Sequence, residues 1–304
     1  MDALEISDVI VDFDPDTMQR RLIFKQAVVD AFSAQANRRA ARIVAALPER
    51  NGILDPVVVD RVLLTAHYEL QQMSEEFYHG QRVYEFLRPL LQALRVGGAA
   101  PPFRVVDVGC GIGYVIRWLA ARTELAADVE LIGADYNVAL VEEARRLAKE
   151  ENLRCSFVVA NAFRLPQAAT IYLSTGVLHH FRNDALRQFF AQHDRQESLA
   201  FAHFDFQPTF FAPIGSWFFH LVRMRLPLAR HDGVASAIRA HRADVLLTAA
   251  KAGVPGFITG MFGSRLWKLP VPRIMHAVVG IRPAYHASLV EALGARSSRL
   301  GPLT

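Results

Sequence analysis

Cysteine is scarce in this chain: only Cys110 and Cys155 occur among 304 residues. Two cysteines cannot build a framework of several disulfides or a cysteine-rich zinc site. No group of histidines and cysteines has the spacing of zinc ligands either, so we predict no metal site. Scarce cysteine is typical of proteins in a reducing compartment, and we expect a cytoplasmic location.

A leader pattern and long apolar runs are also missing. The chain begins Met1-Asp2-Ala3-Leu4-Glu5, without the basic start and apolar core of a secretory signal. The longest uncharged apolar stretch, residues 206–222, is interrupted by Pro208, Pro213 and Gly215. It also falls short of the ~20 apolar residues that a membrane-spanning helix needs. We therefore expect no transmembrane segment.

Lysine is rare, since it supplies only four of the 34 basic residues. The abundance of arginine and alanine is explained more simply by a GC-rich bacterial genome than by an anion-binding patch. The net charge of +4 is mild and no run of basic residues occurs, so we expect no nucleic-acid partner. The chain is 52% hydrophobic and 21% charged, which excludes a mostly disordered protein.

The first third of the chain reads as helices. Glycine is nearly absent from residues 15–96, and Asn51-Gly52 marks one clear break. Asp55-Pro56 is a typical helix start, after which apolar residues recur at helical spacing. A further helix is expected over residues 74–94.

A change in composition ends this helical part. Residues 97–102 read Gly-Gly-Ala-Ala-Pro-Pro, and short apolar strands then alternate with helical patterns. This alternation predicts a parallel sheet with helices on both faces. We expect a helical cap over residues 1–100 and an α/β domain over 101–304, with a weakly ordered tail after residue 292. Strands are predicted at 104–108, 130–134, 155–159, 171–174, 199–204, 256–261 and 275–281, and helices at 137–151 and 235–252.

The most informative segment is residues 105–113, Val-Val-Asp-Val-Gly-Cys-Gly-Ile-Gly. A strand, a glycine turn and a helix start form a corner that binds nucleotides, because the backbone can approach the ligand and free amides face it. The spacing G-x-G-x-G differs from the dinucleotide pattern G-x-G-x-x-G, whose third glycine would fall on Tyr114. Asp107, two residues before the first glycine, would repel a pyrophosphate but suits a ligand with an amino group.

Two further polar residues follow neighbouring predicted strands. Asp135 ends the second strand, where a carboxylate can accept hydrogen bonds from a ribose. Asn161 follows the third strand, where its amide could bind an adenine edge. Asp135 could instead cap the next helix, and Tyr136 beside it could be a packing residue.

These segments together resemble the motifs of class I methyltransferases, which use S-adenosylmethionine (SAM). The glycine turn resembles the first motif, residues 133–137 (Gly-Ala-Asp-Tyr-Asn) the second, and residues 159–162 the third. Residues 175–181 (Thr-Gly-Val-Leu-His-His-Phe) resemble the small-molecule branch that includes quinone-biosynthesis methyltransferases. The resemblance covers residues 102–285. It implies a Rossmann-like α/β fold with a seven-stranded, mostly parallel sheet, an antiparallel last strand, SAM as cofactor and S-adenosylhomocysteine as product.

The resemblance also implies residue roles. The turn would lie along the methionine part of SAM, Asp107 would organise the turn and hold the amino group, and Asp135 would hold the ribose. Tyr136 would lie against the adenine, and Asn161 stands where the family commonly has Asp. Tyr78 and Arg82, which share a helix face at i, i+4, are candidates for contact with cofactor or substrate, and the alternative is an ordinary exposed helix face. The predicted cofactor residues are Asp107, Gly109, Cys110, Gly111, Gly113, Asp135, Tyr136, Asn161, Ala162, Phe163, Thr175, Tyr78 and Arg82.

Three residues are candidate catalytic groups. Methyl transfer needs an aligned nucleophile in a dry site, and a hydroxyl or carbon acid also needs a general base. His179 and His180 follow the fourth strand and Asp205 ends the fifth, at the edge where α/β sites open. The histidine pair could also merely order its loop. Asp205 is not followed by Asp-Asn, which leaves a catechol-type magnesium site without support.

The acceptor side is expected in the cap and in an apolar insertion, residues 206–233. The insertion's aromatic residues could pack the cap onto the core, form a homodimer interface, line an apolar acceptor pocket or touch a membrane surface. We expect a metal-independent SAM-dependent methyltransferase acting at oxygen or carbon of a small, largely apolar or aromatic molecule. The alternatives are a protein or RNA methyltransferase and a SAM-binding regulator without turnover. The aromatic residues are Phe206, Phe210, Phe211, Trp217, Phe218 and Phe219.

Overall fold

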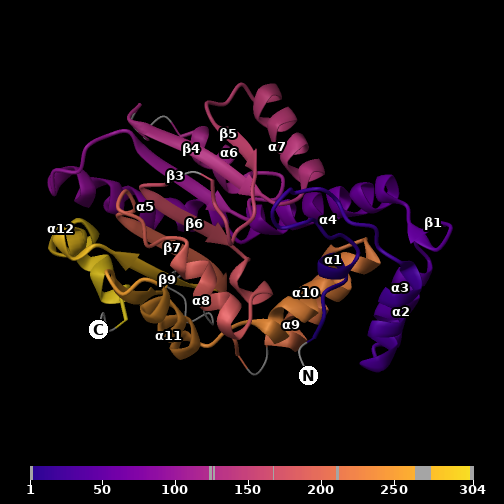
Figure 1. The fold of residues 1–304 in the computed structure, drawn as a ribbon. Coiled ribbons are helices and arrows are strands. Elements are labelled where there is room, and N and C mark those ends of the chain that lie inside the picture. Colours follow the sequence, from indigo (N-terminus) through magenta and orange to yellow (C-terminus); the bar gives the residue numbers. More distant parts are fainter. Residues whose placement is uncertain are drawn as a thin grey trace.

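A seven-stranded sheet forms the centre of the molecule in a computed structural model that describes residues 3–122, 125, 127–166, 168–209, 212–263 and 275–301 (Figure 1). The strand order is β5-β4-β3-β6-β7-β9-β8. All neighbours are parallel except β9, which runs antiparallel to β7 and β8. The predicted fold class is confirmed. The strands are β3 (Phe103–Val108), β4 (Val129–Asp135), β5 (Ser156–Val159), β6 (Ile171–Thr175), β7 (Ala200–Phe206), β8 (Ile258–Phe262) and β9 (Met275–Ile281).

The strand order fixes where a ligand can bind. From β3 the chain crosses to β4 on one side, whereas β6 lies on the other side of β3. Connections that leave a strand in opposite directions open a crevice at the carboxyl ends of the strands. The glycine turn follows β3 and therefore lies at this crevice.

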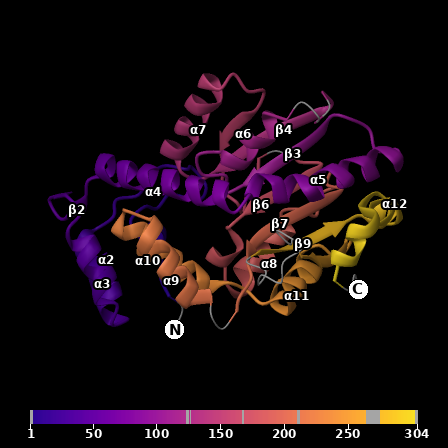
Figure 2. The same ribbon diagram turned by 180° about the vertical axis from the view of Figure 1, so that it is seen from behind.

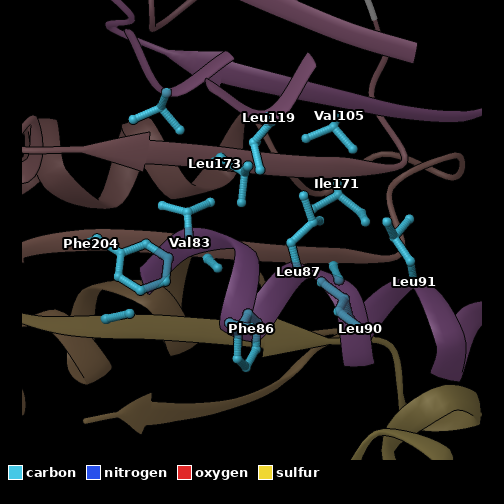
Figure 3. Close-up of a cluster of buried hydrophobic side chains, with 14 of the residues drawn as sticks. Val83, Phe86, Leu87, Leu90, Leu91, Val105, Leu119, Ile171, Leu173 and Phe204 are labelled. Carbon is cyan, nitrogen blue, oxygen red and sulfur yellow. The ribbon is translucent and has the colours of Figure 1, made fainter. Parts of the chain in front are cut away.

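Helices cover both faces of the sheet. On one face lie α5 (His79–Val96), α6 (Tyr114–Ala120), α7 (Val138–Glu150) and α12 (Pro283–Leu293), and on the other α8 (Asn183–Ala191) and α11 (Ala243–Gly253). The strands are apolar on both sides because each face is buried. Figure 3 shows α5 supplying Val83, Phe86 and Leu87 to the core beside Ile171 and Leu173.

A second group of helices forms a cap with its own core (Figure 2). This core joins Phe32, Val44 and Leu63 from the first part of the chain to Met224 and Leu228 after β7. The cap is therefore built from two separate segments. Its elements are α1 (Ile6–Val9), α2 (Lys25–Ala34), α3 (Arg38–Ala45), β1 (Glu49–Arg50), β2 (Ile53–Leu54), α4 (Pro56–Glu76), α9 (Ala212–Arg223) and α10 (Pro227–Arg239).

The division at residue 100 stays a prediction, although packing assigns α5 to the sheet rather than to the cap. The predicted start of α4 is confirmed, because the Asp55 side chain accepts hydrogen bonds from the first free amides. The expected helix over 74–94 is wrong at one point. The chain breaks between α4 and α5, where Tyr78 adopts a left-handed φ of 55°.

Two other expectations are corrected. The helix predicted over 235–252 is two helices, α10 and α11, because Ala240 is extended and the His241 ring hydrogen-bonds the carbonyls of Leu178 and Phe181. Residues 294–299 form a 3-10 turn, so order continues past residue 292, and the Gly301 amide bonds Met261. Phe210 and Phe211 lie outside the described residues. None of the described helices is both long and apolar enough to cross a membrane.

Candidate functional site

A cavity of about 660 Å³ lies between the carboxyl ends of the strands and the cap. The sheet side contributes the glycine turn and the residues after β4, β5 and β6. The cap side contributes the segment around α1, one side of α4, and part of α9 and α10. The cavity therefore joins the predicted cofactor corner to residues far away in sequence.

The glycine turn is tightly shaped. Gly109 and Gly111 adopt left-handed φ values of 72° and 54°, a region that favours glycine. A Cβ on Gly111 would stand 2.6 Å from Cδ2 of His67, a cap residue that lines the cavity. Gly113 has φ 76° but packs against Phe157 and is not among the described lining residues.

Asp107 is a buried carboxyl group at the floor of the cavity, with 2% of its surface exposed. Its Oδ1 has no hydrogen-bond partner among the described residues. Burial, and then the charge of Asp135, raise the pKa of Asp107 to about 7. A buried carboxylate without a partner is costly, so this atom fits a ligand that brings a cationic donor, as the amino group of SAM does.

Asp135 organises the turn directly. Its Oδ2 accepts a hydrogen bond of 2.8 Å from the Gly111 amide, and its Oδ1 one of 2.9 Å from the Asn137 amide. Burial raises the pKa of this carboxyl. Asp135 thus holds the amide of the residue that caps α7, whereas the cap itself is Asn137, whose Oδ1 accepts the Ala139 amide. A carboxylate has about four acceptor positions, so room remains for a ribose hydroxyl at the cavity surface.

The side chains expected around the adenine line the cavity and contact the cap. The Tyr136 ring meets the Phe13 ring edge-on, with 5.5 Å between centroids. Asn161 accepts a hydrogen bond from the Phe163 amide and donates one of 3.2 Å to the Pro15 carbonyl. The cap segment around residues 13–16 thus closes this end. Further predicted residues in the lining are Gly109, Cys110, Ala162, Phe163 and Thr175.

The structure does not bring Tyr78 and Arg82 to the cavity. Tyr78 is 51% exposed at the break between α4 and α5, and neither residue belongs to the described lining. Arg82 is buried and its Nε donates to the Phe77 carbonyl. The i, i+4 pattern fails here because a helix break falls on Tyr78. His79, their neighbour, lines the cavity instead, and burial, then Arg82, lower its pKa to about 3.

His179 and Asp205 form a buried pair. Asp205 Oδ1 lies 2.9 Å from His179 Nδ1, and its Oδ2 accepts the His179 backbone amide at 2.8 Å. Burial acts against ionisation, but the charge and hydrogen bonds of His179 bring the pKa of Asp205 to about 2. His179 lines the cavity, whereas Asp205 stands behind it. The geometry makes Asp205 the group that orients His179.

Glu5 is the cavity residue that sequence reasoning missed. It is 3% exposed, and its Oε1 lies 3.6 Å from His179 Nε2 without a hydrogen bond in the part of the chain that the structure describes. Burial raises the pKa of Glu5. No local pattern marks this residue, because its surroundings come from parts of the chain more than 170 positions away.

His180 sits in a small ionic network with the same cap segment. Its Nδ1 lies 2.8 Å from Asp8 Oδ1, and Arg239 Nη1 lies 2.6 Å from Asp8 Oδ2. Burial lowers the pKa of His180, but Glu5 and Asp8 outweigh this and raise it to about 9. These ion pairs hold α1 against the segment that follows β6.

Ligand atoms of Glu5, His179 and His180 lie within 4.8 Å of one another, close enough to hold a metal ion. Arg239 Nη1 stands 3.5 Å from Glu5 Oε1 and already places positive charge there. The sequence could not show this group, because Glu5 is remote from the histidines in the chain. The expectation of no metal stays a prediction.

Comparisons with known proteins concern the part of the chain that contains the glycine turn. A family described as methyltransferase domain matches residues 105–196. Over 94 residues the chain is 34% identical to a trans-aconitate 2-methyltransferase from Pseudomonas aeruginosa, covering 30% of this chain. The match spans about a third (32%) of that relative's length.

Two solved structures are similar in fold. One is magnesium protoporphyrin IX methyltransferase from Synechocystis with bound S-adenosylhomocysteine, at 18% identity, TM-score 0.43, and coverage of 85% of this chain and 99% of that one. The other is the plantazolicin methyltransferase BpumL, at 12% identity, TM-score 0.49, and coverage of 85% and 95%. The family match and the geometry of the glycine corner agree: residues 105–196 of this chain are a class I methyltransferase domain, and SAM is its cofactor.

Proposed function

We propose that the whole chain is a SAM-dependent methyltransferase of a small, largely apolar molecule, transferring the methyl group to oxygen or carbon. The observation that carries this proposal is one continuous cavity that runs from the glycine corner to the cap. Its volume of about 660 Å³ falls within the roughly 300–1,000 Å³ typical of small-molecule sites. A covered cavity of this size disfavours a folded protein or an RNA helix as acceptor.

The cap contributes a cluster of apolar side chains to the cavity, which supports an acceptor with a large apolar part. Polar cap residues line the cavity as well, and a few of them can orient a small molecule by hydrogen bonds. Residues 175–181 resemble quinone-biosynthesis methyltransferases, and a quinone-like aromatic ring is therefore one candidate acceptor. The apolar cap residues are Val11, Phe13, Met18, Leu63, Leu70, Met73, Leu228 and Ala229.

The charge of the cavity wall disfavours one acceptor class. Glu5, Asp8 and Asp232 all line the cap side of the cavity. A polycarboxylate, such as the acceptor named for the Pseudomonas aeruginosa relative, would meet these carboxyl groups at close range. We therefore propose a neutral acceptor with a hydroxyl group or an acidic carbon.

SAM supplies an already activated methyl group when bound. The chain's own residues then align the acceptor, exclude water and remove its proton. We assign proton removal to His179 at Nε2, since Asp205 holds Nδ1 and so favours the tautomer with Nε2 free. Glu5 Oε1 lies 3.6 Å from Nε2, where its charge can stabilise the imidazolium that forms once the proton has moved to His179.

The first test is calorimetric titration of the purified protein with SAM and, separately, with NAD. Saturable SAM binding without NAD binding is the expected result, and absence of SAM binding would refute the cofactor assignment for the whole protein. Asp135→Ala should then weaken SAM binding strongly. Unchanged affinity would overturn the ribose role.

Turnover is tested with methyl-labelled SAM and a panel of phenols, enols, neutral aromatic alcohols and polycarboxylates. His179→Ala should retain SAM affinity within about threefold and lose roughly 10²–10⁴-fold in rate, the usual contribution of a general base. His286→Ala, on α12 outside the described cavity lining, is the matched control. SAM binding with no labelled product from any acceptor would support the SAM-binding regulator instead.

A further inference from the structure

Helix α9 leaves a continuous row of large apolar side chains in solvent. Ile214, Trp217, Phe218, Leu221 and Val222 are 62%, 47%, 64%, 41% and 66% exposed. Their spacing of i, i+3, i+4, i+7 and i+8 places them on one face of the helix. Scattered exposed apolar residues are ordinary, but a contiguous row of five marks an interaction surface.

The opposite face of α9 is firmly held. The Phe219 ring packs against Phe77 of the cap at 5.1 Å between centroids. His220 is 5% exposed, hydrogen-bonds the Ser216 carbonyl and lines the acceptor cavity. The orientation of the helix is therefore fixed, with one side as cavity wall and the other side facing out.

Basic residues lie at and beyond the carboxyl end of α9. Arg225 is exposed just after the helix, whereas Arg223 lies on the side of the helix opposite the apolar row and pairs with Glu76. Arg39 and Arg42 of α3 line a groove together with Leu226 and Pro227 at the start of α10. No acidic residue occurs in the described lining of that groove. Positive charge beside an exposed apolar helix complements an anionic surface.

The size of the face argues against a second copy of the chain as its occupant. Large apolar and aromatic side chains carry about 150–250 Å² each, and about half of each is exposed here, which gives on the order of 500 Å². A stable protein interface needs about 800 Å² from each partner. Two copies would also bring their flanking arginines together.

We propose that α9 is an interfacial helix that inserts its apolar row into the surface of an anionic lipid bilayer. Arg39, Arg42 and Arg225 lie over the headgroups, and the helix lies in the plane of the membrane. Because the other side of α9 is a wall of the cavity, the surface places the acceptor site next to the bilayer. The placement of the acceptor site next to the bilayer rests on the proposed function and implies a lipid-soluble acceptor. The binding of α9 to the bilayer does not depend on the proposed function.

The test is co-sedimentation of the full chain with vesicles of phosphatidylcholine alone and of phosphatidylcholine mixed with phosphatidylserine, at low and physiological salt. We expect binding to the mixed vesicles that weakens as salt rises. Phe218→Asp combined with Val222→Asp should weaken binding at least tenfold. Val96→Asp, an equally exposed apolar residue on α5, should leave it unchanged. Arg39→Ser with Arg225→Ser should remove the preference for anionic lipid.

Controls separate folding and cofactor binding from the membrane surface. All five substituted positions are exposed, so thermal unfolding and SAM titration should match the parent protein in every variant. Absence of binding to mixed vesicles at low salt would overturn the proposal, as would binding that survives the double aspartate change. A dimer seen by light scattering and dissociated by the same change would assign the face to a second copy instead.

Discussion

Replacing Asp107 by asparagine should make the protein more stable and bind its cofactor less well. Burial and the neighbouring Asp135 raise the pKa of Asp107 from 3.8 to about 7. Each pKa unit corresponds to about 1.36 kcal/mol, so ionising this group in the folded protein costs roughly 4 kcal/mol. The asparagine amide avoids that cost, but it is still a buried polar group, and its burial destabilises the protein by about 1–3 kcal/mol. The expected net gain is about 1–3 kcal/mol for the ligand-free protein.

The pH dependence of stability provides a second test of whether Asp107→Asn stabilises the protein. A raised carboxyl pKa means that the folded state holds its proton longer than the unfolded state, so wild-type stability falls as pH rises from about 4 to about 7. The stabilisation by Asp107→Asn should therefore grow over that window and stay constant above it. At roughly 2–4 °C per kcal/mol, the melting temperature should rise by about 2–12 °C at pH 8.

The assay is thermal unfolding of the ligand-free protein between pH 4.5 and pH 8, followed by calorimetric titration with SAM. A hydrogen bond to a charged group is worth about 2 kcal/mol, so SAM affinity should fall about 30-fold. Asp30→Asn, exposed on α2, controls for loss of one charge. Destabilisation by Asp107→Asn, or a stability difference independent of pH, would refute the reasoning and make Asp107 a structural support.

Further expectations concern the turn, the core, the cap and metal. Gly111→Ala should weaken SAM binding at least tenfold by calorimetry, because the new Cβ meets the His67 ring; unchanged affinity would contradict the tight turn. Phe86→Ala should cost about 3–5 kcal/mol in denaturant unfolding, and a loss below about 1 kcal/mol would deny its core role. The raised pKa of His180 contributes stability that is complete below its unfolded value of 6.5 and is lost as pH rises through about 9. The melting temperatures of wild type and Asp8→Asn should thus converge over that window, and a constant gap would count against the ion pair. Dialysis against a chelator should leave SAM affinity and turnover unchanged; rescue of lost turnover by added Zn²⁺ or Mn²⁺ would overturn the expectation of no metal.

The sheet and the cofactor corner could be predicted because their signals are local. The glycine spacing, the apolar strand residues and Asp135 all fall within short windows, and the predicted bounds of β9, 275–281, are those of the structure. Asn137 caps α7 through its own side chain, which is a contact between near neighbours. Local chemistry decides these elements, so a sequence is enough.

The acceptor side could not be predicted because its contacts are long-range. Glu5 meets His179 and Asp8 meets Arg239 only after the whole chain has folded. The break at Tyr78 is marked in the sequence only by Gly80 two residues later, and the helical spacing continues on both sides of it. Helical spacing predicts α4 and α5 correctly but does not predict the break between them.

Because the cap is built from two separate segments, both segments must be exchanged to give this chain the acceptor preference of a relative. Residues near Phe32 and Leu63 share one core with Met224 and Leu228, and Ile6 and Ser7 donate backbone hydrogen bonds to Asp232. A chimera that transplants only the first segment would leave half of a foreign core facing half of the native one. Both segments therefore behave as one cassette. Recombination between relatives should preserve function when its crossovers fall outside the cap, in the connections to the sheet, and should fail when a single crossover separates the halves.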